Sequence, residues 1–341
     1  MQDGKANNQG CLWTVVVFAF SLLAFGLFSL FGISALFAAI MGLGLAIVIA
    51  NKLMGKPQKG FLWGSAFFYF AVVMVLRFAV GMIKDIMKEN KAPTFNKTEA
   101  VARTKMVEDR DTIYVYSSNR FWKDNFGNAY TTTLTVREAD YKLLYKHLEE
   151  YRGTASVNFW GDLYDYLDQK DTPKLDLVLR AFAEIQKKEN LDQMEFAEMV
   201  VTCIQDIPYS LVFEGACLAP ENYEPEIERI LKQCPECCVG GVKFGIQNPV
   251  TFLQSLKGDC DTRTVLIYAI LKYFGYDIAI LNSDYYRHSI LGINLPGAGT
   301  YKTYYGKRYL LWETTNKYFK AGDVPSTFNN VSHWNVVLTS K

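Results

Sequence analysis

A run of 39 residues, 12–50, contains no charged side chain. One membrane-spanning helix needs about 20 apolar residues, so this run is long enough for two helices, with a turn near Gly32 and Ser34. A second apolar run covers 61–83 and is interrupted only by Arg77, which lies near its end and can snorkel to a membrane interface. We therefore predict three transmembrane helices, at about 12–31, 34–50 and 61–83.

A buried hydrophobic hairpin of a globular protein is the alternative interpretation of these apolar runs. A cleavable signal peptide fits poorly, because its apolar core has only about 7–15 residues. Lysines cluster in the loop 51–60 and again directly after residue 83, so the positive-inside rule favours a cytoplasmic loop only narrowly. We expect a multi-pass integral membrane protein whose large C-terminal domain lies outside the cytoplasm.

The charges are distributed unevenly along the chain. The 341 residues include 36 basic and 35 acidic side chains, a net charge of +1. Residues 1–83 hold five of the basic groups and one of the acidic groups, which leaves 31 and 34 for the remainder. A nucleic-acid binder usually has a basic excess, so no nucleic-acid partner is expected. The lipid bilayer is the expected environment of the first part.

Hydrophobic patterning predicts a hairpin followed by helices. Residues 84–110 are polar and indicate a linker, whereas alternation over 111–117 predicts a strand. A turn at 124–128 separates this strand region from a second strand at 130–136. Apolar residues then recur at helical spacing, so 138–205 is predicted to be mostly helical.

The last part of the chain combines one helix with several strands. A helical pattern covers 261–274, and Gly275 is well placed as the residue after its C-cap. A helix followed by an antiparallel meander defines an α+β domain. The predicted strands are 277–281, 288–293, 309–312 and 334–338. The predicted parts are a membrane anchor at 1–91, a linker with a β-hairpin and a helical subdomain at 92–190, and a catalytic domain at 191–341.

Cys260 is the candidate nucleophile. It stands at the predicted start of a helix, after Gly258 and Asp259. Free N–H groups and the helix dipole favour a thiolate there, which lowers the pKa of the thiol. Because Asp259 and Asp261 oppose this effect by like charge, the cysteine would need a histidine partner.

Only three histidines are present, and His288 is the one placed to act with Cys260. His147 lies in a Lys/Glu-rich helix, where a solvated position is expected, and His333 has no evident partner. His288 begins the second predicted strand after the cysteine helix, one strand beyond it. Glu313 ends the next predicted strand, so adjacent antiparallel strands can bring its carboxylate to the imidazole, orient the ring and stabilise its cation.

This order resembles the transglutaminase-like superfamily, the papain-like clan of cysteine proteases and acyl transferases, over about 192–341. The resemblance implies a transglutaminase-like fold with helices packed on an antiparallel sheet, and a catalytic triad of Cys260, His288 and Glu313. In that family the third member lies in an Asp-x-Thr motif, whereas this chain has Glu313-Thr314-Thr315. The spacing to the acid is also enlarged by a Gly-rich insert at 296–306, which we interpret as an extended hairpin loop.

Gln205 is a candidate for stabilising an oxyanion. The segment Ile204-Gln205-Asp206-Ile207-Pro208-Tyr209 is similar to a Gln-x-Ile-Pro-Tyr segment that precedes the cysteine helix in bacterial members. By this resemblance Gln205 would donate to the oxyanion together with the backbone N–H of Cys260. The alternative is a glutamine at a helix end before a proline.

The other cysteines leave two possibilities open. A C-x-x-C at 234–237 would need further ligands, such as Cys217 or Cys203, to bind zinc. A disulfide from Cys217 to one of three downstream cysteines is favoured outside the cytoplasm, and free thiols are expected within it. No motif implies an organic cofactor or a metal. The cysteines concerned are Cys203, Cys217, Cys234, Cys237 and Cys238.

The leading hypothesis is a membrane-anchored cysteine peptidase or transglutaminase-like acyl transferase. It would act on a peptide-type amide of a protein or peptide substrate through a thioacyl intermediate. The second hypothesis is a transglutaminase-fold scaffold or binding module with a silent site. A transporter or channel part is the third, although Arg77 is the only ionisable residue in its apolar runs.

Overall fold

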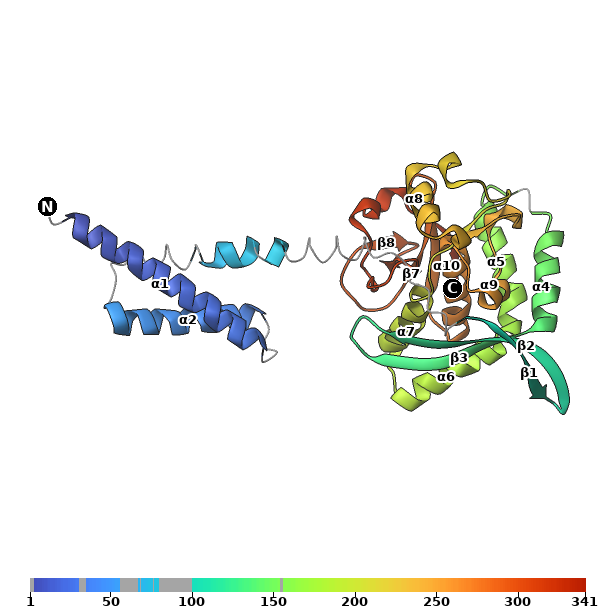
Figure 1. The fold of residues 1–341 in the computed structure, drawn as a ribbon, viewed down its shortest axis with the longest axis horizontal. Helices are drawn as coiled ribbons and strands as arrows, with labels where there is room; N and C mark the ends of the chain where they lie inside the picture. Colours follow the sequence, from blue (N-terminus) through green and yellow to red (C-terminus); the bar gives the residue numbers. More distant parts are fainter. Residues whose placement is uncertain are drawn as a thin grey trace. The chain divides into compact units, whose positions relative to one another are not determined.

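The computed structural model forms two compact units, Met1–Met87 and Lys88–Lys341 (Figure 1). The structure describes residues 3–30, 35–55, 67, 69–75, 77–79, 100–153 and 156–341.

Two long helices make up most of the described part of the first unit. Helices α1 (Asp3–Leu30) and α2 (Ala35–Met54) pack against one another. A Cβ atom at Gly42 would lie 3.1 Å from the carbonyl oxygen of Ser21, so the missing side chain lets the two backbones approach closely. The buried hydrophobic side chains of this unit include Trp13, Val17, Ala39, Leu43, Ala46, Ala50, Tyr69 and Val73.

The prediction of three transmembrane helices is wrong. Among the described residues, no helix has both the length and the apolarity needed to cross a membrane, and most of the third predicted span, 61–83, lies outside them. The apolar run is instead divided between two helices that bury part of their side chains against each other, and α2 continues into Asn51 and Lys52. The predictions of a multi-pass integral membrane protein and of an external catalytic domain fail with it.

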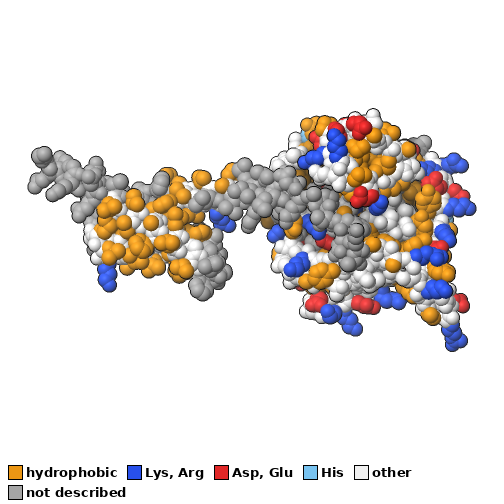
Figure 2. Space-filling view, viewed as in Figure 1, with side chains coloured by type: hydrophobic (Ala, Val, Ile, Leu, Met, Phe, Trp, Pro, Cys, Tyr) orange, Lys and Arg blue, Asp and Glu red, His pale blue; other side chains and the backbone are white. Residues whose placement is uncertain are grey.

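Apolar side chains also lie on the outer surface of this helix pair. Figure 2 shows hydrophobic side chains over the visible face of the first unit. The charge-free run thus supplies both the contact between the helices and much of the surface around it. The exposed large side chains on α1 and α2 are Leu12, Val15, Phe20, Leu23, Leu27, Phe37, Ile40, Met41, Leu45, Val48 and Leu53.

The second unit begins with a three-stranded antiparallel sheet. Its strands are β1 (Ala102–Glu108), β2 (Asp111–Lys123) and β3 (Ala129–Arg137), in that order. The predicted hairpin between β2 and β3 is confirmed, and its turn is closed by a hydrogen bond from the Asp124 N–H to the Asn128 carbonyl at 3.0 Å.

Four helices follow, which confirms the predicted helical region. They are α4 (Glu138–Glu150), α5 (Phe159–Asp171), α6 (Asp176–Glu189) and α7 (Gln193–Gln205), with a 3-10 turn, η2 (Thr172–Lys174), before α6. Asp192 caps α7 in a reciprocal capping box with Glu195, which satisfies backbone donors at the helix start. The helix ends at Gln205, three residues before Pro208.

Short elements connect α7 to the predicted cysteine helix. Strands β4 (Leu211–Val212) and β5 (Cys238–Val239) pair in parallel. Between and after them lie η3 (Pro220–Asn222), α8 (Pro225–Gln233), η4 (Pro235–Cys237), η5 (Lys243–Gly245) and α9 (Pro249–Ser255).

A five-stranded antiparallel sheet follows α10 (Cys260–Tyr273). Its strand order is β10-β6-β7-β9-β8, so the last strand pairs with β6 rather than extending the predicted meander. Two 3-10 turns, η6 (Ser326–Phe328) and η7 (Val331–His333), precede β10. The strands are β6 (Ile278–Ser283), β7 (His288–Ile293), β8 (Tyr301–Tyr304), β9 (Lys307–Trp312) and β10 (Asn335–Thr339).

Two strands lie where the sequence predicts linker or loop. β1 falls within 84–110 and β8 within the Gly-rich insert 296–306. Both are edge strands with mostly exposed or half-exposed side chains. They therefore lack the hydrophobic alternation that identifies a strand, and their pairing with β2 and β9 decides their conformation.

The five-stranded sheet is buried on both faces. Ile278 and Ile280 of β6 join the large core that also contains Leu266 of α10, whereas Ala279 and Leu281 join a smaller core with Trp334. This is the period of two expected for a strand. The large core also includes side chains from β2, β3 and α4 to α7, so one core runs through residues on both sides of the predicted boundary at 190. The α+β class with an antiparallel sheet is confirmed.

Candidate active site

Cys260 is the first residue of α10. The side chain of Asp259 accepts a hydrogen bond from the Thr262 N–H at 3.2 Å, as an N-cap does. A Cβ atom at Gly258 would lie 2.8 Å from both the Phe252 ring and the methyl group of Thr262. Glycine is therefore required there by space rather than by backbone conformation, and the thiol that follows is buried, with only 8 % exposure.

Strand register brings Glu313 to His288. In the ladder between β7 and β9, Leu291 pairs with Trp312, so Glu313 falls opposite Ile290 and diagonally across from His288. A glutamate is long enough to span this diagonal. Its Oε2 atom lies 2.8 Å from the Nε2 atom of His288, and the carboxylate is fully buried.

The second carboxylate oxygen of Glu313 is fixed by Thr315. Oε1 accepts hydrogen bonds from the backbone N–H of Thr315 at 2.7 Å and from its hydroxyl at 2.6 Å. The intervening Thr314 shares a hydrogen bond with Thr264 of α10 at 2.8 Å. The Glu-x-Thr spacing thus has a local reason: one threonine aims the acid, and the other attaches its segment to the cysteine helix.

Cys260 and His288 form a side-chain hydrogen bond. Because Nε2 of the ring is engaged by Glu313, the other ring nitrogen, Nδ1, is the one left for the thiol. The structure therefore brings the three predicted residues together in the order thiol, imidazole, carboxylate, which is the arrangement of a nucleophile, a base and a group that orients the base.

Burial disfavours the charged forms of Cys260 and His288, and the neighbouring groups of opposite charge offset part of this effect. Burial and then Asp261 raise the pKa of the Cys260 thiol, whereas His288 lowers it, and the net direction is upward. The expectation that a helix start lowers this pKa is therefore not met, because desolvation is larger. For His288, burial lowers the pKa, but Glu313 and Cys260 raise it well above the usual range. His288 also lowers the pKa of Glu313 against the effect of burial.

Gln205 lies next to the triad but points its amide N–H groups at the protein backbone. Its Nε2 atom donates to the carbonyls of Glu313 at 2.6 Å and Phe319 at 3.0 Å. Its Oε1 atom is buried without a hydrogen-bond partner among the described residues. In this conformation Gln205 holds the segment that carries Glu313, and its role as an oxyanion donor stays a prediction.

Arg263 is a structural residue of the site that sequence reasoning missed. It is fully buried and donates only to backbone carbonyls: Gly258 at 3.0 Å, Ile204 at 3.0 Å and Pro208 at 2.5 Å. Burial lowers its pKa to about 10. Arg263 therefore joins the Gln205 segment to the residues that precede Cys260. The sequence signal that could have identified it is its position in the first turn of the predicted helix, three residues after Cys260, from which its side chain can reach the carbonyls before the helix.

Two tyrosines near the thiol were also missed. Burial, and then the charge of Cys260, raise the pKa of Tyr209, which closes the segment that begins at Ile204. Tyr164 of α5 donates to Asp261 at 2.7 Å and accepts from Asn282 at 2.8 Å. Tyr209 belongs to the segment that the resemblance singled out for Gln205, whereas the hydroxyl of Tyr164, on a helix face, gives no sequence signal of its contact with Asp261.

The two remaining histidines lie outside the triad. His147 is on α4, but it is half-buried rather than solvated, and its Nδ1 atom is buried without a hydrogen-bond partner among the described residues. His333 stacks on the exposed ring of Tyr285, with ring centroids 4.1 Å apart. His288 itself packs against Phe328, with centroids 5.0 Å apart, and against Trp334, so an aromatic wall lines one side of the imidazole.

The cysteine alternatives are decided in favour of disulfides. Cys217 bonds to Cys238, and Cys234 bonds to Cys237, while Cys203 is a buried thiol. Within the described part of the chain no cluster of three or more potential ligands could hold a metal ion.

Comparison of the chain with protein-family models, with curated proteins and with solved structures finds no match. The resemblance to transglutaminase-like enzymes therefore depends on the residues and the geometry described above.

Proposed function

We propose that the second unit is a thiol hydrolase or acyl transferase of the transglutaminase-like type, acting on a peptide-type amide. The observation that carries the proposal is the continuous buried chain from Cys260 through His288 to Glu313, with a 2.8 Å contact between imidazole and carboxylate. Each member of the chain is held by a separate element of the fold.

The proposed reaction follows from these positions. The sulfur of Cys260 bonds to the carbonyl carbon while its proton resides on His288. The imidazolium then protonates the leaving amine as the C–N bond breaks, which leaves a thioacyl enzyme. Water or a second amine attacks this intermediate, His288 accepts its proton, and the sulfur leaves. The Cys260 N–H, at the start of α10, has no intrahelical acceptor and can stabilise the oxyanion, whereas the Thr262 N–H is bonded to Asp259.

The test is the pH dependence of Cys260 alkylation in the full-length chain, measured site by site by mass spectrometry. Wild type is compared with His288→Ala and with His147→Ala as the matched control. Because His288 lowers the pKa of the thiol, we expect the Cys260 rate to fall at least about tenfold in His288→Ala and to be unchanged in the control.

The alternative is a silent scaffold, which is favoured by the net upward pKa of the buried thiol. It predicts that Cys260 reacts only like an ordinary thiol of pKa about 8.5, with or without His288. That outcome would remove the catalytic proposal.

A further inference from the structure

A disulfide-bonded segment stands between the oxyanion candidate and the nucleophile. We name residues 213–242 the cap. Its two ends are joined by hydrogen bonds from the Phe213 N–H to the Val239 carbonyl at 2.8 Å and from the Val242 N–H to the Phe213 carbonyl at 3.0 Å. The disulfide between Cys217 and Cys238 links the same two limbs. The cap is therefore a closed structure with a narrow base.

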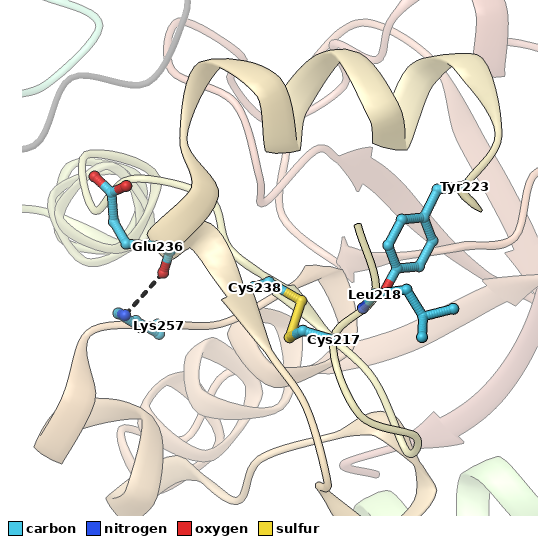
Figure 3. The surroundings of a disulfide bond; sticks show 6 residues. All are labelled: Cys217, Leu218, Tyr223, Glu236, Cys238 and Lys257. Carbon is cyan, nitrogen blue, oxygen red and sulfur yellow. Dashed lines mark hydrogen bonds between the residues drawn. A yellow bond between two sulfur atoms is a disulfide. The ribbon is translucent and has the colours of Figure 1, made fainter. Parts of the chain in front are cut away.

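Aromatic packing stiffens the cap internally. The rings of Phe213 and Tyr223 stack with centroids 5.0 Å apart, and the Tyr223 hydroxyl accepts from the Leu218 N–H at 2.8 Å. Figure 3 shows the Cys217–Cys238 bond in the middle of this segment, with Tyr223 and Leu218 on one side and the contact between Glu236 and Lys257 on the other.

Two tethers attach the cap beside the reacting residues. Lys257, three residues before Cys260, donates from Nζ to the Glu236 carbonyl at 2.8 Å. Glu224, at the N-cap of α8, forms a two-fold ion pair with Arg287, the residue directly before His288. One tether therefore lies on the thiol side of the site and the other on the imidazole side.

The reacting groups have little contact with solvent. Cys260 is 8 % exposed and the side chain of His288 is 10 % exposed. An acyl group must therefore reach the sulfur past the residues that bury it. The cap is fixed to the residues before Cys260, through Lys257, and to the residue before His288, through Arg287.

We propose that the cap sets the acyl-donor specificity of the enzyme: it admits a slender, extended amide to Cys260 and excludes branched or bulky acyl groups. This inference rests on the proposed function, and it assigns the substrate class to the same site. The Cys217–Cys238 bond and the Glu224–Arg287 pair are the contacts that fix the cap to itself and to the residue before His288.

The experiment compares two alkylating probes on the full-length chain, iodoacetamide and a bulky fluorescein iodoacetamide. The rate of each at Cys260 is measured by mass spectrometry in wild type, in Glu224→Ala and in Cys217→Ser/Cys238→Ser. The matched control is Cys234→Ser/Cys237→Ser, which removes a disulfide within one limb. Because Glu224 makes an exposed ion pair of small energetic weight, its variant keeps the fold even if the double cysteine variant does not.

We expect wild type to strongly prefer iodoacetamide. The preference should fall at least fivefold in Glu224→Ala and in Cys217→Ser/Cys238→Ser, and persist in the control. Equal rates of the two probes in wild type, or an unchanged preference in Glu224→Ala, would overturn the inference. The result is readable even if His288→Ala leaves the pH profile unchanged, because an ordinary thiol also needs access; failure of the proposed function is thus separable from failure of the cap.

Discussion

At the scale of single residues, hydrogen bonds with backbone groups orient the side chains of the site. Glu313 receives hydrogen bonds from both donors of Thr315 and faces His288 with its other oxygen. Arg263 donates its hydrogen bonds to three backbone carbonyls. A buried guanidinium without a carboxylate is costly, so its position is explained by the two segments that it joins beside Cys260.

Replacing Glu313 by glutamine should destabilise the protonated form of His288. The substitution keeps the length and the hydrogen-bonding ability of the side chain but removes the charge that raises the pKa of His288. The pKa of His288 should therefore fall, and the imidazolium should be lost at a lower pH. Each unit of lost pKa should reduce the thiolate pair near pH 7 by roughly tenfold.

The measurement is an NMR titration of the His288 ring together with the Cys260 alkylation rate at pH 7. Glu108→Gln, which removes a carboxylate paired with Arg137 elsewhere in the fold, serves as the control. An unshifted His288 titration in Glu313→Gln would contradict the role assigned to the acid.

At the scale of elements, the start of α10 is fixed by packing against α9. Phe252 of α9 lies against Gly258, and the Gly258 carbonyl accepts from the Ser210 N–H at 3.2 Å. The turn before the nucleophile is therefore held from two sides, and any side chain at Gly258 must displace the phenyl ring or the helix start.

Gly258→Ala should destabilise the second unit by about 1–3 kcal/mol, the usual cost of overpacking, and should also slow Cys260 alkylation near pH 7. Urea denaturation measures the first effect. Gly215→Ala is the control, because a Cβ atom there meets nothing within 4 Å. Equal stabilities of the two variants would show that the turn adapts without strain.

At the scale of the whole molecule, buried acids link stability to pH. Burial raises the pKa values of Asp171, Glu198 and Asp259 to about 7 each. Asp171, at the end of α5, accepts from Asn248 at 2.6 Å and from the Val250 N–H at 2.9 Å, so it joins α5 to the start of α9. The folded state binds protons at these groups more tightly than the unfolded state does.

The free energy of unfolding should therefore decrease as pH rises. For Asp171 the unfolded pKa is about 3.8 and the folded pKa about 7, so between these values only the folded state is protonated. The titration of this carboxyl alone should lower the free energy of unfolding by on the order of 2 kcal/mol between pH 5 and pH 8. Asp171→Asn should remove that part of the pH dependence, because an amide does not titrate. The amide oxygen can still accept both hydrogen bonds, so the fold should be kept.

Urea denaturation of wild type and Asp171→Asn at pH 5 and pH 8 measures this difference. Asp165→Asn is the control, since Asp165 lies on the same helix with its carboxylate bonded to Gln169 near the surface. Parallel pH dependence in wild type and Asp171→Asn would show that Asp171 does not titrate in this range.

The sequence by itself determined the local elements and the residues that we propose for the active site. Hydrophobic periodicity predicted the hairpin at β2 and β3 and the helices α4 to α6, because each of these buries one face at a regular interval. It also predicted α7 and α10, although these two helices are buried on nearly all sides. The predicted order of Cys260, His288 and Glu313 is realised as one hydrogen-bonded chain, because strand register follows from the alternation of apolar residues.

Only the tertiary structure decided how apolar and polar groups find their partners. The run 12–50 has no charge, yet its sequence does not say that Trp13 and Ala46 are buried together in a helix pair, nor that no described helix there can cross a membrane. Disulfide pairing, the edge strands β1 and β8, and the burial of Arg263 likewise depend on contacts between distant segments. Hydrophobicity along a chain is a local quantity, whereas burial and pKa depend on neighbours that only the folded chain supplies.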